Sequence, residues 1–179
     1  WQSSLTAEPW HYRRAARIGV WCDRKSGQFT VGFRQSHSKQ ITPIDACMVL
    51  AAGFENLFTA FAQLLPQLKA GRAVTHLEVV QAAFEGESEG ERKRNVVSIR
   101  HTQPLTKADI VKIRQLAEAN QYSILSEYEK GQFSCLTEAQ VPPLHYYLPA
   151  QDLRLAFRMG DFIQVNASLN QQMIEQAID

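Results

Sequence analysis

The order of apolar and polar positions predicts a sheet that begins with a hairpin. Residues 12–21 alternate in the manner of a strand. One face of this strand carries Arg14, Ala16, Ile18 and Val20. The polar turn 23–27 separates it from a second strand over 29–33, so we expect these two strands to pair.

The rest of the chain continues the pattern of short strands. We expect further strands over 41–44, 76–84, 96–101, 122–128 and 133–136, and a last hairpin formed by 146–148 and 153–157. The acidic, glycine-containing stretch 85–91 is expected to be a solvated, mobile hairpin loop without a functional site.

Three segments show helical spacing. The first runs from residue 45 or 46 to 68, with Pro66 ending or kinking its last turn. The second begins at Thr106, which forms a capping box with Asp109, and runs to about 120. The third begins near Ser168, and its apolar side carries Leu169, Met173, Ile174 and Ala177. The predicted fold class is α+β, a mostly antiparallel sheet built from hairpins with about three helices.

Composition and charge narrow the function only slightly. The chain has 179 residues, 45% of them hydrophobic, and its 19 basic and 18 acidic residues give a net charge of +1. That balance neither favours nor excludes RNA, because a local basic cluster is sufficient. No stretch reaches the roughly 20 apolar residues of a membrane helix, and no secretory signal is visible. Three widely spaced cysteines fit a reducing cytoplasm. Because it starts at Trp1, we expect the chain to be a piece of a longer protein.

The stretch 161–166 lies between a predicted strand and a predicted helix. Phe162, Gln164 and Asn166 occupy alternate positions within it. Their spacing alone favours a structural role, in which Phe162 and Val165 pack in the core and Asn166 or Ser168 caps the helix. Connections of this kind also carry function more often than element interiors do.

The order Phe162-x-Gln164-x-Asn166 resembles the motif that opens the methyltransferase domain of the RNA uracil-C5-methyltransferase family. Further matching segments, in the same order and at similar spacing, are Tyr12–Arg17, Val31–Arg34, Cys47, Ile99–Thr102, Pro104–Leu105 and Asn170–Gln171. The resemblance covers most of the chain and is strongest to members that act on bacterial 23S rRNA. It implies that 1–158 is the central α+β domain and that 159–179 begins a Rossmann-like methyltransferase domain.

The resemblance also implies roles for two residues of the motif. Gln164 would contact S-adenosylmethionine, and an amide suits this role because it can donate and accept at once. Phe162 would lie beside the flipped target uridine, whose carbon-5 is inaccessible while the base is stacked. Asn166 matches the motif equally well as a ligand or as a helix cap.

The resemblance changes the role expected for Cys47. Alone it would be a buried helix cysteine. Family members that act on ribosomal RNA hold a 4Fe-4S cluster with four cysteines, and Cys47 matches the fourth, at the entrance to a helix. The other three form an upstream group that this chain does not contain, and Cys22 and Cys135 match no ligand position. We therefore expect Cys47 to be a free thiol here and a cluster ligand in the parent.

Basic residues cluster near the first hairpin. Arg13, Arg14, Arg17 and Arg34 fall on the two strands expected to pair, and Lys39 and His37 follow in the next loop. Beside them, Trp10 and Tyr12 offer faces for base stacking. These residues could bind RNA phosphates or form a solvated face with salt bridges. The resemblance favours contact with RNA.

The function implied is part of an S-adenosylmethionine-dependent 23S rRNA uracil-C5-methyltransferase. The family's nucleophilic cysteine and its glutamate base lie in the methyltransferase domain, and no residue of this chain matches them, so we expect the fragment alone to be inactive. One alternative is a transfer RNA enzyme of the same family, although Cys47 favours ribosomal RNA. Another is a non-catalytic RNA-binding module. We expect a monomer located in the cytoplasm, without a membrane partner.

Overall fold

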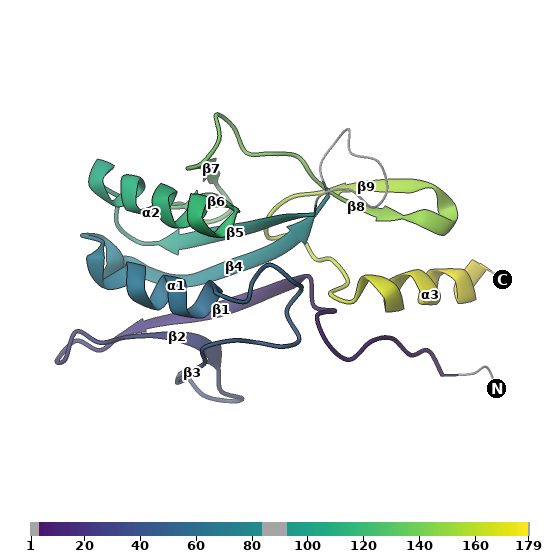
Figure 1. Cartoon of the computed structure of the whole chain (residues 1–179), viewed down its shortest axis with the longest axis horizontal. Coiled ribbons are helices and arrows are strands. Elements are labelled where there is room, and N and C mark those ends of the chain that lie inside the picture. Colours follow the sequence, from purple (N-terminus) through teal and green to yellow (C-terminus); the bar gives the residue numbers. More distant parts are fainter. Residues whose placement is uncertain (1–3, 84–92, 179) are drawn as a thin grey trace.

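A seven-stranded sheet forms the body of the protein (Figure 1). The computed structural model describes residues 4–83 and 93–178. The sheet has the order β3-β2-β1-β4-β5-β6-β7. The strands are β1 Ala15–Cys22, β2 Phe29–Arg34, β3 Ile41–Pro43, β4 Val74–Ala82, β5 Arg94–His101, β6 Tyr122–Glu127 and β7 Phe133–Cys135. Neighbouring strands pair antiparallel except β5 and β6, which are parallel because the helix α2, Lys107–Asn120, crosses over between them.

The described residues form three α-helices, so the predicted α+β class is confirmed. Helices α1, Leu57–Leu64, and α2 pack on one face of the sheet (Figure 1). The main core lies between them and the strands, and its fully buried members include Ile18, Phe54, Phe58, Phe61, Leu77, Ile99, Ile113 and Ile124. Short 3-10 turns follow α1 at Leu65–Gln67 and Gly71–Ala73.

A two-stranded hairpin, β8 Leu144–Leu148 and β9 Leu153–Phe157, confirms the predicted last hairpin. Its turn contains a 3-10 segment, Pro149–Gln151. The hairpin is joined to the large sheet through backbone hydrogen bonds between Ala83 and His145, of 2.9 and 3.3 Å. A second core lies here, where Leu144 packs with Val80 and Leu125 on the sheet face opposite α1 and α2.

The prediction of one long helix from residue 45 to 68 is wrong, because only residues 57–64 of this segment are α-helical. The preceding segment is drawn into extended pairing with the N-terminal segment: Arg13 donates its N–H to the carbonyl of Val49 at 2.8 Å, and Ala51 donates to the carbonyl of Arg13 at 2.9 Å. Gly53 then adopts a positive φ of 96°, which interrupts any helix. Leu50 and Phe54 are buried as their pattern predicts, but from a non-helical backbone.

The capping box at the start of α2 is confirmed. The Thr106 hydroxyl accepts from the Asp109 N–H at 3.2 Å, and the Asp109 carboxylate accepts from the Thr106 N–H at 3.0 Å. The same carboxylate accepts from the N–H groups of Lys69 at 2.7 Å and Ala70 at 3.4 Å. Burial raises the pKa of Asp109, but these hydrogen bonds outweigh it and hold the pKa below its ordinary value.

Helix α3, Ala167–Ile178, lies with the N-terminal segment and the β8–β9 hairpin at one end of the molecule, away from α1 (Figure 1). The side chain of Gln172 donates to the carbonyl of Thr6 at 2.9 Å and links the helix to that segment. The predicted apolar side of α3 is not buried: Met173 is 41% exposed and Ala177 is also exposed.

The expected loop 85–91 lies outside the described residues. Among the residues that are described, no helix is both long enough and apolar enough to cross a membrane.

Candidate functional site

A tight turn fixes the connection between β9 and α3, residues 158–166, which we call the seam. The Asp161 carboxylate accepts from the Arg158 N–H at 2.7 Å, and the Asp161 N–H donates back to the Arg158 carbonyl at 3.0 Å. Gly160 takes the left-handed conformation that the turn requires, with φ of 89°. Met159 and Ile163, each 7% exposed, pack into the second core and anchor the seam on both sides of the turn.

The two motif side chains point away from this anchor. Phe162 is 84% exposed, so the expectation that it packs in the core is wrong. Ile163 is buried instead. Gln164, two residues after Phe162, is exposed as Phe162 is. The ring of Phe162 is therefore accessible to solvent and to any ligand at the seam.

Asn166 caps helix α3. Its side-chain oxygen accepts from the N–H of Leu169 at 3.0 Å, and its carbonyl accepts from the N–H of Asn170 at 3.0 Å. The capping prediction for Asn166 is therefore confirmed. The cap fixes the orientation of α3 directly after the exposed Gln164.

Arg14 braces the seam from the first strand region. Its Nε donates to the carbonyl of Gln164 at 2.8 Å, and its backbone N–H donates to the carbonyl of Val165 at 2.9 Å. Its guanidinium lies over the ring of Tyr146 in β8, 4.5 Å from the ring centroid. Burial lowers the pKa of Arg14 below its ordinary value, although the Tyr146 hydroxyl raises it in part.

This placement corrects the expectation that Arg14 lies on an exposed strand face with the other arginines. Arg14 is 8% exposed. The alternation of the strand places Arg14 on the same face as the apolar residues Ile18 and Val20. This pattern was the signal in the sequence that Arg14 is buried. The sequence gave no indication of Tyr146 as its partner, because β8 is distant in the chain.

The other basic residues do not form one cluster. Arg17 and Arg34 share the sheet face opposite α1, because Gly19 pairs with Gly32 and each arginine lies two residues from one of them. Both arginines are exposed. Arg13 is half-buried beside the seam and donates to the carbonyl of Ala15 at 3.1 Å, while Lys39 is exposed in the turn between β2 and β3.

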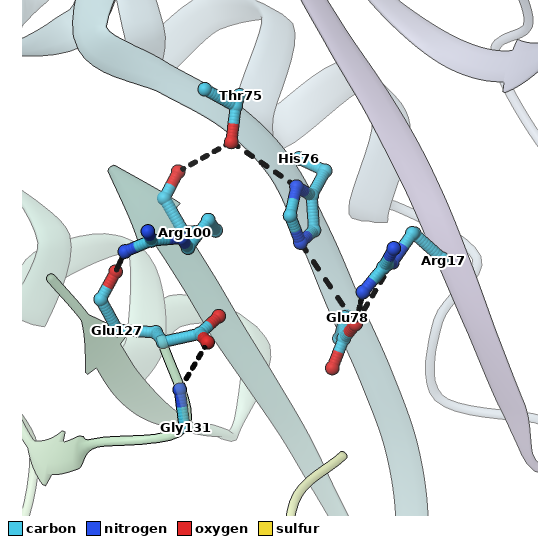
Figure 2. Close-up of polar contacts among 7 residues, drawn as sticks. All are labelled: Arg17, Thr75, His76, Glu78, Arg100, Glu127 and Gly131. Atoms are coloured by element: carbon cyan, nitrogen blue, oxygen red, sulfur yellow. Dashed lines mark hydrogen bonds and ion pairs between the residues drawn. The ribbon is translucent and has the colours of Figure 1, made fainter. Parts of the chain in front are cut away.

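A charge-balanced network occupies the face around Arg17 (Figure 2). Arg17 binds the Glu78 carboxylate through Nε at 2.8 Å and through a second, shorter contact from Nη2. His76 Nε2 lies 3.9 Å from the same carboxylate. Burial first, and then the positive charge of Arg17, lower the pKa of His76, whereas Glu78 opposes them. Glu78 therefore partly neutralises the positive charge of Arg17.

Arg100 and Glu127 close the network on the neighbouring strands (Figure 2). Arg100 donates to the backbone carbonyl of Glu127 at 2.9 Å, and the Glu127 carboxylate accepts from the N–H of Gly131 at 2.8 Å. These bonds hold the turn after β6 close to the C-terminal end of β5.

The cysteines do not meet in the fold. Cys22, Cys47 and Cys135 are free and half-buried. Cys47 directly precedes the turn at 48–49, well before α1, and its carbonyl accepts from the N–H of Leu50 at 3.2 Å, so its expected position at a helix entrance is wrong in this structure. Within residues 4–83 and 93–178, no group of three or more His, Cys, Asp or Glu side chains could hold a metal ion. These residues do not fit an iron–sulfur cluster by themselves, since Cys47 would supply a single ligand.

Two cavities flank the N-terminal segment. One of about 500 Å³ is lined by Arg14, Tyr146 and the first turn of α3. The other, of about 510 Å³, is lined by Gln164, Tyr12, Leu169 and Met173. The seam thus contributes to both cavities while presenting Phe162 to solvent.

Comparison with solved structures identifies the class of fold. The tRNA (uracil-54, C5)-methyltransferase of Pyrococcus abyssi, solved in complex with S-adenosyl-L-homocysteine, matches 96% of this chain and 41% of its own with a TM-score of 0.62 and 10% sequence identity. At that identity the likeness shows the fold alone. No protein-family model matches the chain.

Sequence comparison identifies the relatives. Proteins named 23S rRNA (uracil(1939)-C(5))-methyltransferase RlmD match it, among them one from Shewanella sp. (strain ANA-3) with 36% identity over 98% of this chain. Another, from Pseudoalteromonas translucida, has 36% identity over 99% of this chain. The chain is therefore homologous to part of the enzymes of the RNA uracil-C5-methyltransferase family, as its motifs predicted. It spans 38% and 37% of the length of these two relatives.

Proposed function

We propose that this chain is part of an S-adenosylmethionine-dependent methyltransferase that forms 5-methyluridine in 23S rRNA. The observation that carries the proposal is the seam, which exposes Phe162 and Gln164 from a backbone fixed by Arg14 and Asn166. The 36% identity to enzymes named RlmD supports the ribosomal substrate. Residues 1–158 would form the central domain, and 159–179 would begin the methyltransferase domain.

Phe162 and Gln164 would then serve the two reactants. A uracil base must leave its stack before carbon-5 can be reached, and an exposed aromatic ring offers it a surface. Phe162 has that exposure, at 84%. Gln164 lines a cavity, and its amide could donate to and accept from the cofactor. S-adenosylmethionine would supply the methyl group.

The bond-forming groups would come from the rest of the protein. Methylation at carbon-5 requires a thiolate that attacks carbon-6 and a base that removes the carbon-5 proton. This chain would position the target uracil and the cofactor, and we expect it to be inactive alone. Cys47 would become the fourth cysteine ligand of a 4Fe-4S cluster in the whole protein.

The exposed cations would contact RNA phosphates. Arg17 and Arg34 are exposed on one sheet face, and Lys39 is exposed in the turn between β2 and β3. Arg13, which is half-buried beside the seam, would contact RNA there. Arg17 would exchange its pairing with Glu78 for a phosphate, which is favourable because RNA releases counterions on binding. We propose that the protein works as a monomer in the cytoplasm, where its RNA substrate is located.

A tritium-release assay tests the proposal. The full-length protein, purified without oxygen, would be mixed with S-adenosylmethionine and RNA that carries tritium at uracil carbon-5. Release from 23S rRNA transcripts but not from tRNA is expected. Release from tRNA alone would replace the proposed substrate with that of the solved Pyrococcus abyssi enzyme. No release from either RNA would leave a non-catalytic RNA-binding module.

A further inference from the structure

Positive charge is concentrated at the edge of the sheet that β1, β2 and β3 form (Figure 1). Residues 15–43, which comprise these strands and their two turns, contain five basic residues and one acidic residue. Their net charge is therefore +4, whereas that of the whole chain is +1. A local excess of this size in a nearly neutral chain favours a polyanion as the partner of this edge.

The cations of this edge are accessible to such a partner. Four are exposed and form no ion pair or side-chain hydrogen bond with any residue that the structure describes: Arg24, Lys25, Arg34 and Lys39. The fifth, Arg17, pairs with Glu78, but its side chain remains 67% exposed. An ion pair this exposed contributes little to stability, so Arg17 can exchange Glu78 for another anion.

An aromatic ring lies on the same face as these arginines. Trp21 and Arg17 occupy alternate positions of β1, and Trp21 is 57% exposed and pairs with Thr30 of β2. Between them the strands carry Gly19 and its partner Gly32, so no side chain of β1 or β2 rises between the ring and the guanidinium. An open sheet face with an exposed aromatic ring is a surface on which unpaired RNA bases stack.

This face is continuous with the side of the sheet that carries the seam. Ala15 of β1 packs against the second core, which also anchors the seam. Arg17 follows on the same face about 7 Å further along β1, and Trp21 follows about 20 Å from Ala15. An RNA strand that places its uridine at Phe162 can therefore continue over the exposed part of β1.

We propose that the exposed face of β1, β2 and β3 binds a single-stranded segment of the RNA outside the target uridine. One base stacks on Trp21, and Arg17 and Arg34 bind phosphates of the same segment. The base has to be unpaired, because a base inside a duplex is already stacked on its neighbours. This surface rests on the proposed function, since it assumes that the protein binds RNA, and it adds a base contact to the phosphate contacts proposed above.

The test measures RNA binding by the full-length protein, using the fluorescence anisotropy of a labelled 23S rRNA fragment, single-stranded or annealed to its complement. Trp21→Ala is expected to weaken binding of the single strand about tenfold, as the loss of one stacking ring does, and to leave duplex binding close to wild type. Trp21→Phe keeps a ring and should bind the single strand nearly as well as the wild type. Arg34→Gln is expected to lower the slope of log affinity against log salt by about 0.7.

Matched controls are available on α2, which packs on the other face of the sheet. Lys107→Gln removes an exposed cation and should leave the salt slope unchanged. Val111→Ala removes an apolar side chain that is 54% exposed and should leave the affinity unchanged.

The outcomes separate this surface from the proposed function. Wild-type RNA binding that Trp21→Ala and Arg34→Gln leave unchanged would overturn the surface and keep the function. Equal losses by Trp21→Ala on single-stranded and duplex RNA would also overturn it, because the ring would not be stacking on an unpaired base. A lower melting temperature for Trp21→Ala with unchanged RNA affinity would mean that another part of the protein covers this face, which overturns the surface as well. A wild-type protein that binds no RNA would overturn both.

Discussion

Arg14 and Gln164, 150 residues apart in the chain, are joined by a hydrogen bond of 2.8 Å from the guanidinium Nε to the backbone carbonyl. The bond uses the main chain of Gln164 and leaves its side-chain amide exposed. The ring of Tyr146 holds the guanidinium from the other side. Arg14 therefore fixes the position of Gln164 without competing for the ligand that its amide would bind.

Replacing Arg14 by methionine tests this brace. The substitution removes a hydrogen bond from a charged donor and the contact with Tyr146, and it leaves the Gln164 carbonyl unpaired, so the free energy of unfolding is expected to fall by about 2–4 kcal/mol. Urea denaturation of the chain measures it. Arg34→Met, at an exposed position, is the control and should change stability by less than about 0.5 kcal/mol. Equal effects of the two substitutions would contradict the brace.

Phe162 is exposed and its neighbour Ile163 is buried, so alanine substitutions at the two positions can be compared directly. Ile163→Ala empties a buried position and should lower the free energy of unfolding by about 2–4 kcal/mol. Phe162→Ala removes an exposed ring and should change it by less than about 0.5 kcal/mol. Thermal melting of both variants is the measurement. A large loss from Phe162→Ala would show that its ring packs in the protein and is not kept for a ligand.

Asp109 joins the start of α2 to the turn after α1. Asp109→Ala removes three backbone hydrogen bonds to one carboxylate and should cost about 2–3 kcal/mol, whereas Glu118→Ala on the exposed side of the same helix should cost little. The fold lowers the pKa of Asp109, so its stabilisation is present above the ordinary value near 4 and is lost as the pH falls below it. Urea denaturation at pH 7 and pH 3 should show a smaller difference between wild type and Asp109→Ala at the lower pH.

The network in Figure 2 makes His76 a reporter of its two charged neighbours. Arg17 lowers and Glu78 raises the pKa of His76. Arg17→Gln should therefore raise the NMR titration midpoint of His76, and Glu78→Gln should lower it further. Shifts in the same direction would contradict the geometry. Because the native pKa lies below the ordinary value, the contribution of His76 to stability is present above about pH 6.5 and is lost as the pH falls.

Local signals predicted much of the fold. The capping box of Thr106 and Asp109 predicted the start of α2, and the strand-like runs on both sides of residues 149–152 predicted the last hairpin. The helix expected over 45–68 failed for a non-local reason. Its apolar spacing is compatible with a helix, but pairing between Arg13 and Leu50 and the positive φ of Gly53 keep residues 45–56 in turns instead of a helix.

The site was predictable only in part, because it also depends on contacts between residues that are far apart in the chain. The motif resemblance named Phe162 and Gln164, but their exposure depends on Ile163 and Met159, which fill a core shared with distant strands. Arg14 was assigned to an RNA-binding face because its charge outweighed its position in the alternation. Its actual environment depends on Tyr146, 132 positions later in the chain, which no local pattern connects to it.

The most direct test of the account measures S-adenosylmethionine binding by calorimetry in the full-length protein, comparing Gln164→Ala with Phe162→Ala. If the braced seam presents one residue to each reactant, Gln164→Ala should weaken cofactor binding about tenfold, the loss of roughly one hydrogen bond. Phe162→Ala should bind the cofactor as the wild type does and lose activity on RNA. Unchanged cofactor binding in Gln164→Ala would contradict the account.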